Sequence, residues 1–209
     1  MSGKSEVKRT FPLVLFAIVF VLNPWVIKLL SQDVFIFTLF LFYTALMILS
    51  FIKKKFTKVI IVFWVLLSFF QFESVKISKV YNSTPAEIDL QTTRMNYYEP
   101  KFARLGYYLE KQPITILFYK IEQNFFDTVD LNLYFPNYLN LISLPFLLIG
   151  LCNLFQSKKT YKYLLLFSIL ILTLIGVNGK FGPFLIFPFL GLAIYLGVET
   201  AVKKIWTTK

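Results

Sequence analysis

The chain has 209 residues, of which 57% are hydrophobic, 19% aromatic and only 16% charged, and its formal net charge is +11. An ordinary soluble domain has about 25% charged residues, so this composition argues against that class. The sequence has no histidine and a single cysteine. These counts exclude an internal disulfide, a Cys/His zinc site and catalysis by a Ser/His or Cys/His pair.

Six apolar runs are candidates for membrane-spanning helices. Val34–Ile52 contains no charged residue and is long enough to cross a hydrocarbon core of about 30 Å. Val59–Phe72 is shorter, and its crossing needs support from the flanking charges. Pro24 predicts a kink within the first run. In chain order the runs are Phe11–Leu30, Val34–Ile52, Val59–Phe72, Tyr138–Phe155, Tyr163–Val177 and Phe184–Val198.

Basic residues gather in the four segments that face the cytoplasm if all six runs cross and the N-terminus is inside. These segments hold more than half of the 22 Lys and Arg residues but only one acid, Glu6. Such an asymmetry is expected of cytoplasmic loops, and it is spoiled if the third run does not cross. We therefore predict six spans with both termini in the cytoplasm. The four segments are Met1–Thr10, Lys53–Lys58, Gln156–Lys162 and Lys203–Lys209.

The fold class that follows is an all-α polytopic membrane protein in three parts. An N-terminal membrane part (1–72) and a C-terminal membrane part (137–209) flank an outer juxtamembrane segment (73–136). We expect it in the cell (inner) membrane, with an organelle membrane as the alternative. The lipid bilayer is then the first partner, and the basic loops need no nucleic acid to explain them because they attract anionic headgroups.

The outer segment predicts three helices. Ala86–Tyr98 is compatible with a helix, Lys101–Gln112 forms a second, and Pro113 suits the first turn of a third that runs to about Phe126. The third helix is amphipathic and should lie flat on the bilayer or over the mouth of the bundle.

The third helix has two distinct faces. We expect the apolar stripe to be buried and the polar face to be wet. The stripe comprises Ile114, Phe118, Ile121 and Phe125, whereas the polar face comprises Lys120, Asn124 and Asp127.

Asp127 and Asp130 lie three residues apart at the end of this helix. A metal site needs more ligands than two carboxylates, and only Glu122 and Asn132 are near them in the sequence. We interpret the pair as water-facing or helix-capping residues. A polar acid/base site at Asp127 and Asp130 is the alternative, and we predict no metal and no cofactor.

Three basic residues of the outer segment lie among tyrosines. Arg94, Lys101 and Arg104 could hold a lipid phosphate, since guanidinium groups bind phosphate in a bidentate manner. Ordinary anchoring at the membrane interface is the favoured role for these side chains, and lipid-phosphate binding is the alternative.

The motifs RMNYYEPKFARLGYYLEKQP, KIEQNFFDTVDLNLYFP and LPFLLIGL resemble uncharacterised small membrane proteins of reduced-genome bacteria. The stretch Thr92–Lys204 is also similar to the last periplasmic segment and terminal helices of GT-C-type membrane glycosyltransferases. That resemblance implies a polyprenyl-phosphate-sugar substrate. Those enzymes carry an acidic catalytic motif in their first outer loop, where this chain has only Asp33, so no catalytic residue is carried over.

Three functions follow from these observations. The leading one is a non-catalytic subunit or scaffold whose lid-like outer segment contacts a membrane-protein partner or a lipid. The alternative is a glycosyltransferase-like enzyme or accessory factor that binds polyprenyl-phosphate, which leaves enzymatic activity open. A lipid transporter is the second alternative, since a path for an apolar lipid leaves no charge signature within the spans.

Overall fold

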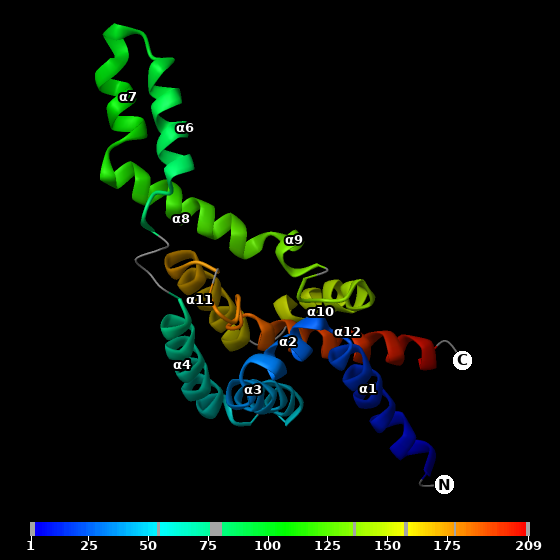
Figure 1. Cartoon of the computed structure of the whole chain (residues 1–209). Coiled ribbons are helices and arrows are strands. Elements are labelled where there is room, and N and C mark those ends of the chain that lie inside the picture. Colours follow the sequence, from blue (N-terminus) through cyan, green and yellow to red (C-terminus); the bar gives the residue numbers. More distant parts are fainter. Residues whose placement is uncertain are drawn as a thin grey trace.

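We describe the protein from a computed structural model, which covers residues 3–53, 55–75, 81–135, 137–156, 159–177 and 179–207. Within these ranges every regular element is a helix, so the predicted all-α class is confirmed. Apolar helices form a bundle, and an arm of three helices extends from it (Figure 1).

The first apolar run is broken into two helices, α1 (Gly3–Val21) and α2 (Pro24–Gln32), which are bent by 66° at the break. Pro24 lacks the N–H group that would continue α1. The buried Asn23 side chain makes up for part of this loss, because its Nδ2 donates to the Val19 carbonyl at 3.0 Å. The kink predicted at Pro24 is confirmed.

The break is tied to the chain segment that precedes α10 (Leu144–Gln156). Asn23 Oδ1 accepts hydrogen bonds from the Asn140 backbone N–H at 2.8 Å and from Ser143 Oγ at 3.2 Å. Asn140 and Ser143 are thereby held by Asn23, and α10 does not extend back through them. The helix expected from Tyr138 therefore begins six residues later, after a short 3-10 turn, η2 (Leu141–Ser143).

Two helices, α3 (Val34–Lys53) and α4 (Thr57–Ser74), are long and apolar enough to cross a membrane. The short third run thus gains polar residues at both ends and becomes a helix of 18 residues. Up to four spans result if two bent pairs each count as one: α1 with α2, and residues 141–156 with 160–175, bent by 115°. The membrane class is supported, and six crossings stay a prediction.

The C-terminal helix α12 (Phe187–Thr207) lies at the centre of the bundle and packs against α10, α1 and α3. Two glycines allow its backbone to touch that of α10. A Cβ atom on Gly150 would lie 1.6 Å from the Ala193 carbonyl oxygen, and one on Gly197 would lie 1.9 Å from that of Phe146. Small residues permit such close crossings of membrane helices.

The irregular chain between α11 (Lys159–Ile175) and α12 is held by a side chain of α4. The buried Gln71 amide donates to the Gly182 carbonyl at 3.1 Å and accepts from the Leu185 N–H at 3.2 Å. Gly182 has a φ of 67°, which an L side chain rarely adopts. Non-helical backbone is tolerated within a membrane protein when its polar groups are satisfied in this way.

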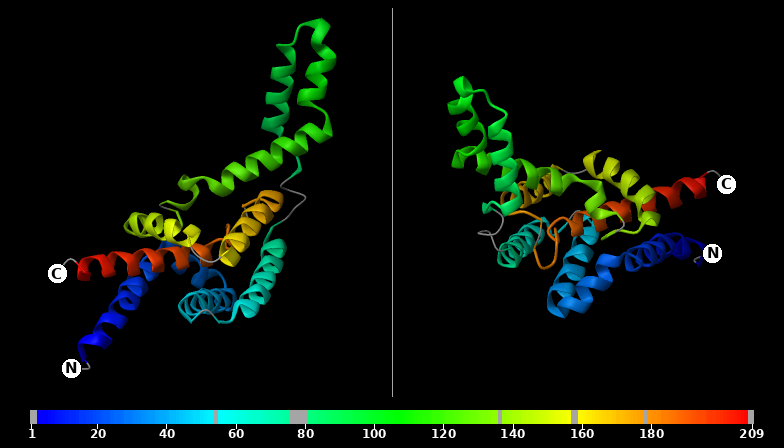
Figure 2. Two further views of the ribbon diagram at one scale, coloured as in Figure 1. Left: turned by 180° about the vertical axis from the view of Figure 1, so that it is seen from behind. Right: turned by 45° about the horizontal axis from the view of Figure 1, so that its top comes forward.

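The outer segment forms the arm. Helices α6 (Pro85–Asn96) and α7 (Ala103–Glu110), joined by η1 (Pro100–Phe102), make a hairpin that extends away from the bundle (Figures 1 and 2). Helix α8 (Pro113–Val129) returns to the bundle and packs along α11, and α9 (Leu131–Tyr134) follows it. The three predicted helices are confirmed within a few residues at each boundary.

The orientation predicted for α8 is wrong in one respect: within the chain, its polar face is the buried one. The Asn124 side chain is buried, and that of Lys120 is only 13% exposed. By contrast, Ile114 and Phe118 are 71% and 65% exposed. The polar face is buried because α8 packs along α11 and because Lys120 pairs with Glu87 of α6, whereas the apolar stripe points away from the protein.

Candidate functional site

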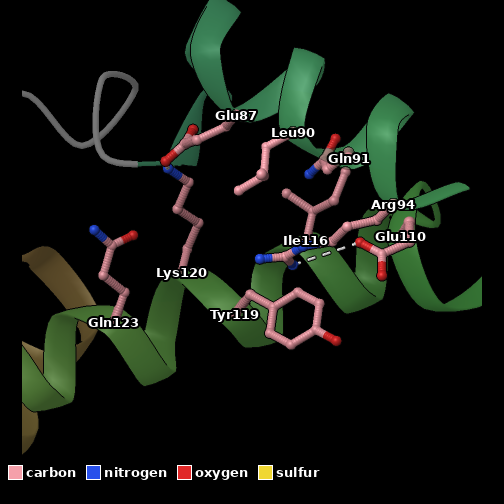
Figure 3. A pocket seen from close by; sticks show the side chains of 9 residues that line it. All are labelled: Glu87, Leu90, Gln91, Arg94, Glu110, Ile116, Tyr119, Lys120 and Gln123. Carbon is pink, nitrogen blue, oxygen red and sulfur yellow. Dashed lines mark hydrogen bonds and ion pairs between the residues drawn. The ribbon is translucent and has the colours of Figure 1, made fainter. Parts of the chain in front are cut away.

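A cleft of about 250 Å³ lies where the α6–α7 hairpin meets α8, and it is lined by four charged side chains together with amide, tyrosine and aliphatic ones (Figure 3). Local signals place these helices. Thr84 and Glu87 form a capping box at the start of α6, and Pro113 begins α8. The lining residues are Glu87, Leu90, Gln91, Arg94, Glu110, Ile116, Tyr119, Lys120 and Gln123.

Glu87 and Lys120 form the tighter of two ion pairs in the cleft. Lys120 Nζ donates to Glu87 Oε1 at 2.5 Å, and the Thr84 N–H donates to Glu87 Oε2 at 2.7 Å. The hydrogen bond from Lys120 and then the one from the Thr84 backbone lower the pKa of Glu87. Both carboxylate oxygens are thus engaged, and the pair fastens α6 to α8.

Arg94 and Glu110 form the looser pair. Arg94 Nη1 lies 3.7 Å from Glu110 Oε2, which is beyond hydrogen-bond distance (Figure 3). The Glu110 side chain is only 8% exposed, whereas that of Arg94 is 53% exposed. Glu110 Oε2 accepts no hydrogen bond from any residue that the structure describes.

Of the three basic residues predicted to hold a lipid phosphate, only Arg94 lines the cleft. Lys101 lies on η1 and pairs with Glu99 at 2.6 Å, and both side chains are exposed. Arg104 is exposed on the first turn of α7. The structure therefore brings Arg94 to Glu110 and does not place Lys101 or Arg104 in the cleft.

Asp127 and Asp130 lie at the end of α8, outside the cleft. Asp130 is the C-cap residue, and its Oδ1 accepts the Asn132 N–H at 2.9 Å. Burial, and secondly the charge of Asp130, raise the pKa of Asp127. No group of three or more potential metal-ligating side chains occurs among the described parts of the chain. The geometry thus assigns Asp130 to helix capping.

An apolar groove of about 210 Å³ lies below the end of α8, among α10, α11 and α12. Thr128 and Tyr134 contribute to its lining, and Tyr134 Oη donates to the Thr128 carbonyl at 2.8 Å. Tyr134 is buried by these contacts. Hydrocarbon side chains form the rest of the lining, among them Leu139, Leu147, Leu151, Ile169, Phe189 and Leu190.

Sequence reasoning did not identify Glu87, Glu110 and Lys120 as site residues. One signal was present: Glu87, Gln91 and Arg94 recur at i, i+4 and i+7, so they share a face of α6. A polar stripe on a helix is usually a solvated face, and nothing local shows that α8 returns to cover it. The contact between residues 87 and 120 is a product of the tertiary fold.

Comparisons of the chain with protein-family models, curated proteins and solved structures gave no match. The similarity of Thr92–Lys204 to glycosyltransferases therefore stays a prediction. What the cleft and the groove can bind follows from their own side chains. The cleft offers hydrogen bonds and charges, whereas the groove offers hydrocarbon and the two hydroxyl-bearing residues Thr128 and Tyr134.

Proposed function

We propose that the protein is a non-catalytic integral membrane subunit or scaffold whose arm docks a partner protein. The observation that carries the proposal is an apolar face on α7, where Leu105, Tyr108 and Leu109 are all exposed. Their i, i+3, i+4 spacing is the pattern with which helices enter an apolar groove of a partner. The hairpin carries α7 away from the bundle (Figures 1 and 2).

In this proposal the chain crosses the membrane six times, with the arm outside and both termini in the cytoplasm. The N-terminal end of α1 and the C-terminal end of α12 lie on one side of the molecule, and the α6–α7 hairpin lies on the other, which supports this topology (Figures 1 and 2). Helix α8 then lies at the outer membrane surface. Its exposed stripe, including Ile114 and Phe118, faces lipid.

Ion pairing within the arm supports a structural role over catalysis. Glu87 and Lys120 engage each other and join α6 to α8. This contact narrows the range of orientations in which the hairpin presents α7, which lowers the entropic cost of binding.

Photocrosslinking from the α7 face tests the proposal. A photoreactive amino acid in place of Tyr108 should give one discrete protein adduct in native membranes. The matched control is Phe35, which is exposed on the membrane helix α3 and should give lipid adducts only. Lipid adducts alone, or none, from position 108 would contradict the docking role.

A second candidate is binding of a prenyl or acyl chain, favoured by the apolar groove among α10, α11 and α12. Its hydrocarbon lining matches a polyprenyl chain, and Thr128 of α8 and Tyr134 of α9 add two hydroxyl-bearing side chains to that lining. Purified protein should then bind polyprenyl-phosphate saturably. Leu151→Trp, which fills the groove, should abolish this binding, whereas Leu148→Trp on the exposed face of α10 should not.

A further inference from the structure

The buried carboxylate of Glu110 has an unused capacity for hydrogen bonds. Only 8% of its side chain is exposed, and its Oε2 lacks a hydrogen-bond donor among the described residues. Arg94 lies close enough to balance the charge but, at 3.7 Å, not close enough to donate. A buried carboxylate without donors is destabilising unless a ligand supplies them.

The neighbouring acid shows the contrast. Glu87 has a donor on each carboxylate oxygen, one from Lys120 and one from the Thr84 backbone. The two acids line the same cleft (Figure 3), yet only Glu110 is left open. Within this cleft a cationic donor would therefore bind at Glu110 rather than at Glu87.

Arg94 supplies the complementary group. About half of its side chain is exposed, so its guanidinium can turn from Glu110 toward an anion without leaving the cleft. Guanidinium groups prefer the paired oxygens of phosphate. With two acids and two bases, the four charged groups of the cleft sum to zero, and a ligand with one positive and one negative group keeps them balanced.

We propose that the Arg94–Glu110 end of the cleft binds a zwitterionic phosphoethanolamine group, with the ammonium on Glu110 and the phosphate on Arg94. A cavity of about 250 Å³ suits a headgroup better than a drug-sized molecule, which needs about 300–1,000 Å³. The source is a lipid headgroup or a soluble zwitterion, and the two share this chemistry.

The cleft and the exposed apolar stripe lie on opposite faces of α8. Ile116, Tyr119, Lys120 and Gln123 line the cleft, whereas Ile114, Phe118, Ile121 and Phe125 form the stripe. On a helix whose stripe faces lipid, the cleft therefore lies on the side that faces water. This step rests on the proposed location of α8. The binding chemistry of Glu110 rests on its burial alone and does not depend on docking by α7.

Phosphocholine is the matched control ligand. It carries the same phosphate and the same charge, but its quaternary ammonium has no N–H group to donate to Glu110. The protein is placed in nanodiscs that contain equal amounts of phosphatidylethanolamine and phosphatidylcholine with identical acyl chains. In native mass spectrometry it should retain about tenfold more phosphatidylethanolamine than phosphatidylcholine. This comparison needs no variant, so a failure to fold cannot confuse it.

Variants then assign the preference to the cleft. Glu110→Gln should abolish the preference, and Glu122→Gln, an exposed acid on another face of α8, should keep it. Free phosphoethanolamine and free phosphocholine, tested as competitors, distinguish the two sources. If phosphoethanolamine is preferred about tenfold only among the soluble ligands, the natural ligand is a soluble zwitterion. If phosphatidylethanolamine is preferred among the lipids, the natural ligand is a membrane lipid. Equal binding within both pairs, or a preference that survives Glu110→Gln, would overturn the proposal. Crosslinking from α7 can succeed in either case, so the two ideas fail independently.

Discussion

The protonation of Glu87 controls how firmly α6 is held to α8. The hydrogen bond from Lys120 lowers the pKa of Glu87 below its ordinary value of 4.5. An acid whose pKa is lower in the folded state stabilises that state above its unfolded pKa, and this stabilisation is lost as pH falls through the folded pKa. The α6–α8 contact should therefore be intact at neutral pH and weaken below about pH 4.5.

Spin labels on α6 and α8 would measure this response. In a Cys152→Ser background, labels at Asp89 and Glu122 should report a broader distance distribution at pH 3 than at pH 6. The change is modest, because a partly exposed pair contributes about 1 kcal/mol or less. Glu87→Gln should flatten the pH response, whereas Glu99→Gln, which breaks the exposed pair with Lys101, should leave it unchanged. A response that persists in Glu87→Gln would assign it to another group.

At the scale of elements, the crossing of α10 and α12 depends on glycine. Gly150→Ala would drive a Cβ atom into the Ala193 carbonyl, which is backbone and cannot rotate aside. Overpacking of this kind costs about 1–3 kcal/mol. Alanine recovers up to about 1 kcal/mol through its helix propensity. A net loss of stability should follow.

Thermal unfolding in detergent gives the measurement for this crossing. Gly150→Ala should lower Tm by several degrees. Gly191→Ala is the milder comparison, since its Cβ would meet the side chains of Thr44 at 3.0 Å and Phe20 at 3.2 Å rather than backbone. Equal Tm values for the two variants would mean that α10 and α12 are not in backbone contact.

The two faces of α8 make a second prediction at this scale. An environment-sensitive fluorophore on Phe118→Cys should report an apolar surrounding in liposomes and be quenched by lipid-borne quenchers. The same fluorophore on Gln123→Cys, at the cleft, should report water. Both variants carry Cys152→Ser. A polar signal from position 118 in liposomes would show that α8 does not lie on the membrane surface.

For the whole molecule, the proposed topology places the arm and the α10–α11 connection on opposite sides of the membrane. In a Cys152→Ser background, single cysteines at Ser83 and Thr160 have comparable, partial exposure. An impermeant thiol reagent applied to intact cells should label Ser83→Cys and not Thr160→Cys. Labelling of both, or of Thr160→Cys alone, would exclude six crossings.

The sequence was sufficient for the helices and insufficient for their contacts. Pro113 and Pro24 mark a helix start and a break because proline acts on its own backbone, so both were predictable. Which face of α8 turns inward depends on α11, a helix that begins 30 residues after α8 ends. Periodicity identifies two faces but cannot show what covers each. The pairing of Arg94 with Glu110 escaped prediction for the same reason.

The hydrogen bonds of Asn23 also constrain the order of biosynthesis. Its amide oxygen accepts from Asn140 and Ser143, which a ribosome makes more than a hundred residues later, and Gln71 likewise waits for Gly182 and Leu185. Until those partners emerge, the first three apolar runs expose polar groups that lipid cannot satisfy. The N-terminal half should therefore stay within the insertion machinery, or with a membrane chaperone, until Leu185 has been made. Chains stalled before residue 138 should be degraded faster than chains stalled after residue 190.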